Sequence, residues 1–129
     1  MSSCFLCKKN QSKEKTTTST SLAHTSWELS SITYFKGEET PKPVTLVFRE
    51  PGQLGGTSGC NSYGATYTLT KKEGLKFELG MATQMACMPG MDTEKKFFEV
   101  MRETDSYEIQ NDELYLKSKG KVLAIFHRK

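Results

Sequence analysis

The stretch YGATYTLT-KKEG-LKFEL, residues 63–79, decides the fold class of this chain. In its second half, Leu75, Phe77 and Leu79 alternate with charged residues, as expected for a strand with one buried face. The intervening Lys71-Lys72-Glu73-Gly74 supplies a turn that ends in glycine. The segment therefore predicts a β-hairpin.

Short strands with turn signals continue on both sides of this hairpin. The sequence predicts a strand over residues 27–35 that opens at Trp27. It also predicts a single helix over Met91–Glu103, with Phe97, Phe98 and Met101 on one face and Asp92 as its N-cap. The other predicted strands cover residues 44–48, 106–110, 113–117 and 121–128. We expect a mainly β (α+β) fold, a compact antiparallel barrel or sandwich with one α-helix packed against it.

The charge of the chain is concentrated at its N-terminal end. Its 129 residues have room for one domain, and Lys8, Lys9, Lys13 and Lys15 against Glu14 give residues 1–25 the whole net charge of +3. Residues 26–129 are therefore electrically balanced. Binding of nucleic acid requires a basic face on the domain itself, so we expect no nucleic-acid partner.

Residues 1–25 are predicted to be a disordered leader, and residues 26–129 the folded domain. The segment QSKEKTTTSTS, residues 11–21, has the composition of a solvated tether. Ser2-Ser3-Cys4 is similar to the end of a bacterial lipoprotein processing box, which would make Cys4 the lipidated residue. No signal segment precedes it in this sequence, so this interpretation requires one upstream of Met1. Two alternatives stay open: incidental cysteines, or Cys4-x-x-Cys7 as half of a zinc site. A complete zinc site would need a second pair of ligands, and His24 and His127 are the only histidines of the chain.

The chain resembles the META domain, also called HslJ-like, at separated positions that keep the family's order and spacing over residues 25–127. The opening Trp27-x-Leu29 is followed by Gly59-Cys60-Asn61-x-Tyr63 and then by Met85-Ala86-Cys87. The resemblance extends through Thr45-Leu46-x-Phe48, Gly64-x-x-Tyr67, Ala82-Thr83, Glu94, Phe97 to Met101, Leu114-x-Leu116 and Leu123-x-x-Phe126.

The resemblance implies a compact antiparallel β structure with one helix. It also implies secreted, envelope or lipoprotein members in Gram-negative bacteria, with links to heat shock and stress and without a known enzymatic activity. From it we expect Trp27, Gly59, Cys60, Asn61, Tyr63, Met85 and Cys87 to form a structural motif.

Cys60 and Cys87 both fall inside this motif. One hypothesis is that they form a disulfide in an oxidising periplasm, and the alternative is two separate buried thiols. We expect no catalytic cysteine, because neither has a histidine or basic neighbour in sequence to lower its pKa. The glycines of residues 55–61 lack the pattern of a phosphate or dinucleotide loop and are expected to shape a sharp bend.

Four methionines, Met81, Met85, Met88 and Met91, surround Cys87. They could form a soft copper site, but methionine more often fills core gaps or adaptable surfaces, so we expect no metal and no other cofactor. Glu94 is accounted for by the first turn of the helix, where the dipole favours negative charge.

The sequence predicts a non-enzymatic domain of the bacterial cell envelope, on the periplasmic side or as an outer-membrane lipoprotein. It would bind a protein or an envelope component during stress or assembly. The alternative is a β barrel that carries a small apolar ligand, and a hydrolase or redox enzyme would require a reactive Cys60 or Cys87. The residues that could line a ligand cavity are aromatic, although their more common use is to fill a core: Tyr34, Phe35, Tyr63, Tyr67 and Phe77.

Overall fold

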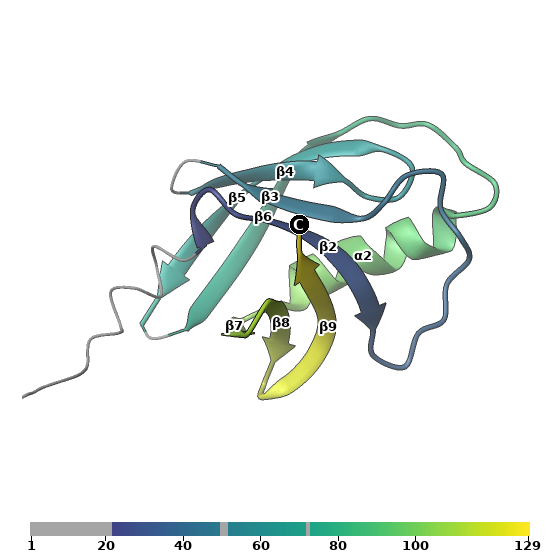
Figure 1. Ribbon diagram of the computed structural model, residues 1–129. Helices are drawn as coiled ribbons and strands as arrows, with labels where there is room; N and C mark the ends of the chain where they lie inside the picture. Colours follow the sequence, from purple (N-terminus) through teal and green to yellow (C-terminus); the bar gives the residue numbers. More distant parts are fainter. Residues whose placement is uncertain (1–21, 50–51, 72) are drawn as a thin grey trace, which may run out of the picture.

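Eight strands close into an antiparallel barrel in the computed structural model, which describes residues 22–49, 52–71 and 73–129 (Figure 1). Each strand pairs with its neighbours in sequence, and the first strand pairs with the last. The mainly β fold with a helix packed on it is therefore confirmed. The strands are β2 (Ser26–Ile32), β3 (Thr45–Phe48), β4 (Gln53–Thr57), β5 (Ser62–Thr70), β6 (Gly74–Ala82), β7 (Ser106–Gln110), β8 (Glu113–Ser118) and β9 (Lys121–Arg128).

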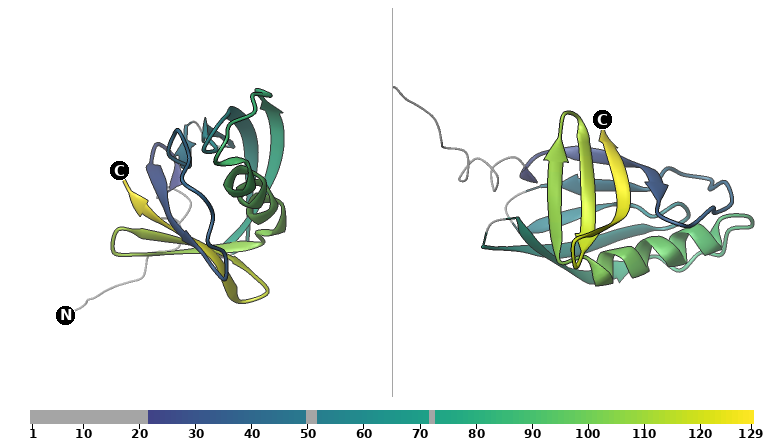
Figure 2. Two further views of the ribbon diagram at one scale, coloured as in Figure 1. Left: turned by 90° about the vertical axis from the view of Figure 1, so that its right-hand side faces the viewer. Right: turned by 90° about the horizontal axis from the view of Figure 1, so that it is seen from below.

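Helix α2 (Met91–Glu103) completes the barrel at its weakest seam. Strands β6 and β7 are in register only at Gly74 and Ser106, flanked by backbone hydrogen bonds from Leu75 to Asp105 and from Tyr107 to Glu73. Beyond that point the two strands diverge, and α2 lies along the side of the barrel between them (Figure 2). The helix thus covers interior side chains that a continuous sheet would otherwise enclose.

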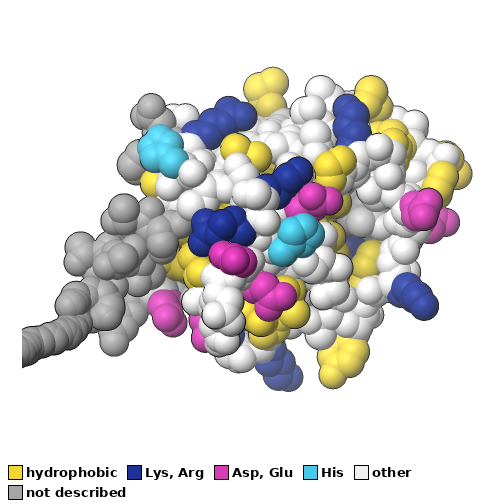
Figure 3. All heavy atoms as spheres, viewed as in Figure 1, with side chains coloured by type: hydrophobic (Ala, Val, Ile, Leu, Met, Phe, Trp, Pro, Cys, Tyr) yellow, Lys and Arg dark blue, Asp and Glu magenta, His cyan; other side chains and the backbone are white. Residues whose placement is uncertain are grey.

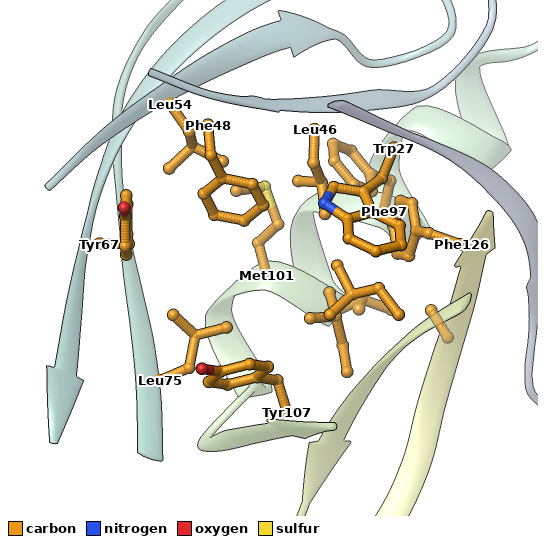
Figure 4. Close-up of a cluster of buried hydrophobic side chains, with 14 of the residues drawn as sticks. Trp27, Leu46, Phe48, Leu54, Tyr67, Leu75, Phe97, Met101, Tyr107 and Phe126 are labelled. Carbon is orange, nitrogen blue, oxygen red and sulfur yellow. The ribbon is translucent and has the colours of Figure 1, made fainter. Parts of the chain in front are cut away.

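The interior of the barrel is filled with side chains. The helix contributes Phe97, Val100 and Met101, whose spacing of three and four residues places them on one buried face. Large side chains from the strands meet them, and Figure 4 shows them pointing toward one another. The fully buried set includes Trp27, Leu46, Phe48, Leu75, Tyr107, Leu114, Leu116 and Phe126.

Four of the five aromatic residues that could line a ligand cavity pack in the core or against it. Tyr63 packs edge-on against Phe97 with ring centroids 5.6 Å apart, and Tyr67 packs edge-on against Phe48 at 5.0 Å. Phe35 and Phe77 pack, half-buried, against the same core. Tyr34 is fully exposed, so its expected place in a cavity lining inside the barrel was wrong.

Strand β4 was not predicted, because Gly55 and Gly56 have low strand propensity. Glycine is needed there: Gly56 has φ +150°, and a Cβ would lie 2.7 Å from the carbonyl oxygen of Thr45 on the neighbouring strand. The close approach of β3 and β4 therefore requires a glycine, and glycine is the residue type that made β4 hard to predict from the sequence.

Three boundaries also differ from the sequence predictions. Strand β2 ends at Ile32 and not at Phe35, because a turn closed by the hydrogen bond from the Phe35 N–H to the Ile32 carbonyl follows it. Gly90, not Asp92, is the N-cap of α2, and the carboxylate of Asp92 instead accepts a hydrogen bond from the backbone N–H of Thr93. Residues 22–25, assigned to the leader, are part of the fold, since Leu22 is fully buried and its carbonyl accepts a hydrogen bond from the Thr25 hydroxyl. Cys4, Cys7 and the rest of residues 1–21 lie outside the described residues.

Candidate functional site

The buried carboxylate of Glu94 is the centre of the most connected polar cluster. Glu94 lies in the first turn of α2 and is only 7% exposed. Its Oε1 accepts hydrogen bonds from Ser58 Oγ at 2.7 Å and from the backbone N–H of Asn61 at 3.0 Å, and its Oε2 accepts one from Asn61 Nδ2 at 2.8 Å. The glycine-rich bend is thereby attached to the start of the helix.

These hydrogen bonds decide the charge state of Glu94. Burial is the largest single influence and opposes ionisation. The donors Ser58, Asn61 and the Cys60 backbone together outweigh it, so the pKa of Glu94 lies below its ordinary value of 4.5. The carboxylate is therefore ionised and satisfied at neutral pH, which is the state of a structural anchor.

Asn61 extends the cluster to the loop between β6 and α2, residues 83–90. Its Oδ1 accepts hydrogen bonds from Thr83 Oγ1 at 2.8 Å and from the Met85 N–H at 2.7 Å, while its Nδ2 donates to the Met85 carbonyl at 3.1 Å. Asn61 is buried, so each of these bonds replaces contact with water. One side chain thus fixes the bend, the loop and, through Glu94, the helix.

A disulfide between Cys60 and Cys87 joins the same segments, with their Cα atoms 5.9 Å apart. The preceding Gly59 has φ +101°, and a Cβ there would lie 2.9 Å from the side chain of Thr40. The glycine thus provides the bend that the sequence predicted. With both sulfurs bonded to each other, neither cysteine is a free thiol in this structure.

Six of the seven predicted motif residues gather around this cluster or adjoin it. Gly59, Cys60, Asn61, Met85 and Cys87 form it, and Tyr63 follows directly in β5, where its hydroxyl donates to the Thr45 carbonyl at 2.6 Å. Trp27 lies elsewhere in the core, opposite Leu46, with the Arg128 guanidinium 4.5 Å from its ring centroid.

Sequence reasoning missed the role of Glu94, together with those of Ser58 and Thr83. Glu94 was assigned to favourable interaction with the helix dipole, whereas the structure makes it the hub of the cluster. A signal was present in its position: Glu94 stands three residues before Phe97 and seven before Met101, on the face that the helix buries.

A surface groove lies between α2, the start of β9 and the end of β2. It has a volume of about 570 Å³, within the usual range for small-molecule sites, and its lining is mostly apolar. The lining residues are Ile32, Thr33, Tyr34, Lys96, Val100, Glu103, Lys121, Val122 and Leu123.

Tyr34 stands at this groove on a strained turn. The turn is closed by a hydrogen bond from the Phe35 N–H to the Ile32 carbonyl at 3.2 Å, and Tyr34 has φ +58°, where a bulky residue is disfavoured. The sequence contained no periodic signal for the groove, because three separate elements form it.

Ser30, His127 and Glu28 lie together on the outer surface of β2 and β9. Ser30 Oγ is 2.8 Å from His127 Nδ1, but His127 Nε2 is 4.0 Å from Glu28 Oε1, too far for a hydrogen bond. Lys129 Nζ lies closer to that carboxylate, at 3.4 Å. The imidazole is half-exposed, so the arrangement is that of a solvated surface contact.

Comparison with known proteins agrees with this fold. The family model described as "META domain" matches residues 20–129. An NMR structure of a protein from Burkholderia xenovorans is 27% identical, with a TM-score of 0.69 over 88% of this chain and 87% of that chain. A second NMR structure is 18% identical with a TM-score of 0.63, over 84% of this chain and 92% of that chain, which shows likeness of fold alone. No curated protein matches the chain.

The disulfide is tested in a Cys4→Ser/Cys7→Ser background. Protein purified from an oxidising compartment and unfolded without reductant should have no titratable thiol, and two after reduction. Because the disulfide closes a loop with a sequence separation of 27, reduction should lower the free energy of unfolding by roughly 3 to 4 kcal/mol. A further Cys60→Ala/Cys87→Ala variant should be insensitive to reductant. Two thiols before reduction would show that the bond does not form.

Replacing Glu94 by Gln should lower the free energy of unfolding at pH 7 by about 1 to 3 kcal/mol, because an amide NH₂ must face a buried donor. The lowered pKa of Glu94 means that its charge stabilises the fold above about pH 4.5, and that this contribution is lost as the pH falls through the folded-state pKa. The difference in the free energy of unfolding between wild type and Glu94→Gln, measured by urea unfolding, should therefore become smaller below pH 4.5.

The matched control is Glu103→Gln, which changes an exposed carboxylate of the same helix and should leave stability nearly unchanged. A stability difference for Glu94→Gln that stayed constant down to pH 3 would contradict the proposed ionised state.

Proposed function

Because the chain belongs to the META domain family, and because its buried polar groups are occupied in holding the fold together, we propose that it is a non-enzymatic, envelope-associated binding domain. The observation that carries this proposal is the use of the motif residues. Cys60 and Cys87 are bonded to each other, and Asn61 and Glu94 are bonded to backbone and side-chain groups. Side chains whose bonding groups are all used within the protein support a structural role and not a catalytic one.

The disulfide supports a location outside the reducing cytoplasm. Disulfides form and persist in oxidising compartments such as the bacterial periplasm. Attachment to the envelope would come from a lipid on Cys4 at the end of the Thr- and Ser-rich tether, residues 11–21. Among the described residues, α2 falls short of the length and apolar character that crossing a bilayer requires.

The groove beside Tyr34 is the binding surface of this proposal. Its floor is apolar, with Ile32, Val100, Val122 and Leu123. Of its two lysines, Lys96 is paired with Glu99 at 3.5 Å, so Lys121 supplies the positive charge for a ligand. Such a surface complements an amphiphile with one apolar chain and a negatively charged head. The ligand is therefore an envelope component of that class, bound on the surface of the barrel, since large side chains fill its interior.

Dodecanoate below its micellar concentration should shift amide resonances of groove residues and saturate, because Val122 and its neighbours bury the chain while Lys121 faces the carboxylate. Dodecyl maltoside and dodecyltrimethylammonium, with the same chain but no negative charge, should bind at least about tenfold more weakly. Val122→Glu and Lys121→Glu should abolish binding, whereas Lys119→Glu, on the same hairpin turn outside the groove, should not. Equal binding of all three amphiphiles, or binding that survives Val122→Glu, would refute the groove as the site.

The lipid anchor is tested separately, by expressing the gene with its native upstream sequence in a Gram-negative host fed an alkyne-labelled fatty acid. The protein should carry the label and sediment with membranes. Cys4→Ser should remove both properties, while Cys7→Ser, three residues away, should keep them. Soluble, unlabelled wild-type protein would eliminate the anchor and leave the binding proposal standing.

A further inference from the structure

The methionines at the end of β6 and in the β6–α2 connection are unusually exposed. Met81 is 83% exposed, Met85 49% and Met88 88%, so these three do not fill gaps in the core. Four of the chain's six methionines fall between residues 81 and 91. Hydrophobic side chains reach the surface at the end of the molecule where this connection lies (Figure 3). Three of the four large hydrophobic residues that are exposed in the described part of the chain are these methionines, which makes this stretch the candidate for a role at the surface.

The backbone beneath these side chains is firmly held. Asn61 binds both the N–H and the carbonyl of Met85, the disulfide holds Cys87, and the N–H of Gly90 donates to Glu38 Oε1 at 3.3 Å. Met88 lies between the last two anchors. The structure thus fixes the loop while leaving its thioether side chains in solvent, so their approach to a ligand requires only side-chain rotation.

One sulfur already faces the loop. Met91 Sδ accepts a hydrogen bond from the Cys87 N–H at 3.3 Å, although Met91 belongs to the first turn of α2. A thioether sulfur has two lone pairs, so this contact leaves one available. Met85, Met88 and Met91 therefore follow one another at intervals of three residues along residues 85–91, which run from the restrained loop into the first turn of α2.

The chemistry of the thioether group limits the kinds of ligand that these methionines would bind. Methionine differs from leucine in two ways, because its unbranched side chain adapts to a partner and its thioether brings a soft, uncharged sulfur donor. Soft, uncharged thioether ligands favour Cu(I) and similar ions over hard ions such as Mg²⁺ or Ca²⁺. We propose that Met85, Met88 and Met91, assisted by Met81, form a binding site for a soft monovalent metal ion, Cu(I) or its analogue Ag(I). Binding is coordination alone and involves no electron transfer.

The experiment titrates Ag(I) nitrate into full-length protein and follows the methionine methyl carbons by NMR. It uses the Cys4→Ser/Cys7→Ser background, because thiolates would compete for a soft ion. The methyl signals of Met85, Met88 and Met91 should shift together and saturate near one ion per chain, with a smaller shift at Met81. The buried Met101 is the internal control and should not move.

Met85→Leu/Met88→Leu should weaken Ag(I) binding by roughly tenfold or more while keeping the apolar surface. Near-ultraviolet circular dichroism of Trp27 should remain unchanged, which shows that the fold is intact. Met81→Leu, the matched single change outside the restrained loop, should weaken Ag(I) binding less. A competition titration with Cu(I) should displace Ag(I) from the same methyl groups.

Two results would overturn the proposal. Unchanged affinity in Met85→Leu/Met88→Leu would show that the methionines serve only as an apolar surface, for example for a protein partner. Methyl shifts that grow independently, without saturation near one ion per chain, would show weak binding to separate thioethers and no site.

Discussion

The hydrogen bonds of the Glu94 carboxylate are the constraint on which the rest of this structure depends. An ionised carboxylate that is 7% exposed is tolerated only if donors replace its water, and Ser58 and Asn61 supply them. The requirement is mutual, because the buried amide of Asn61 also needs the carboxylate. It brings the glycine-rich bend to the first turn of α2 and so sets where the helix lies on the barrel.

The position of the helix matters because the barrel is incompletely hydrogen-bonded. Between β6 and β7 the register contains a single residue pair, and Phe97, Val100 and Met101 of α2 fill the opening beyond it. The disulfide and the Asn61 hydrogen bonds hold the loop that leads into the helix. The polar cluster and the apolar core thus act together to close the gap between β6 and β7. The polar cluster positions the helix, and the apolar core buries one of its faces.

Buried and exposed groups divide the tasks of the molecule. The residues whose chemistry would attract attention in a sequence, namely Cys60, Asn61 and Cys87, are used internally. The large hydrophobic residues that are presented to solvent are Tyr34, at the edge of the α2–β9 groove, and the methionines Met81, Met85 and Met88. This division is the physical basis for proposing a binding domain, with the groove and the methionine loop at different places on the surface.

The sequence by itself determined the fold class, the bounds of α2 and most strands, because alternation and helical spacing are local consequences of which face is buried. It also marked Cys60, Asn61 and Cys87 as one motif through their resemblance to a family. It did not reveal β4, where Gly56 is selected by the approach of Thr45 on another strand. Nor did it reveal that Glu94 bonds Ser58 and Asn61, that Tyr34 faces solvent, or that three elements form the groove. Only the tertiary structure decided these, because each depends on contacts between residues far apart in the chain, whose positions no local pattern encodes.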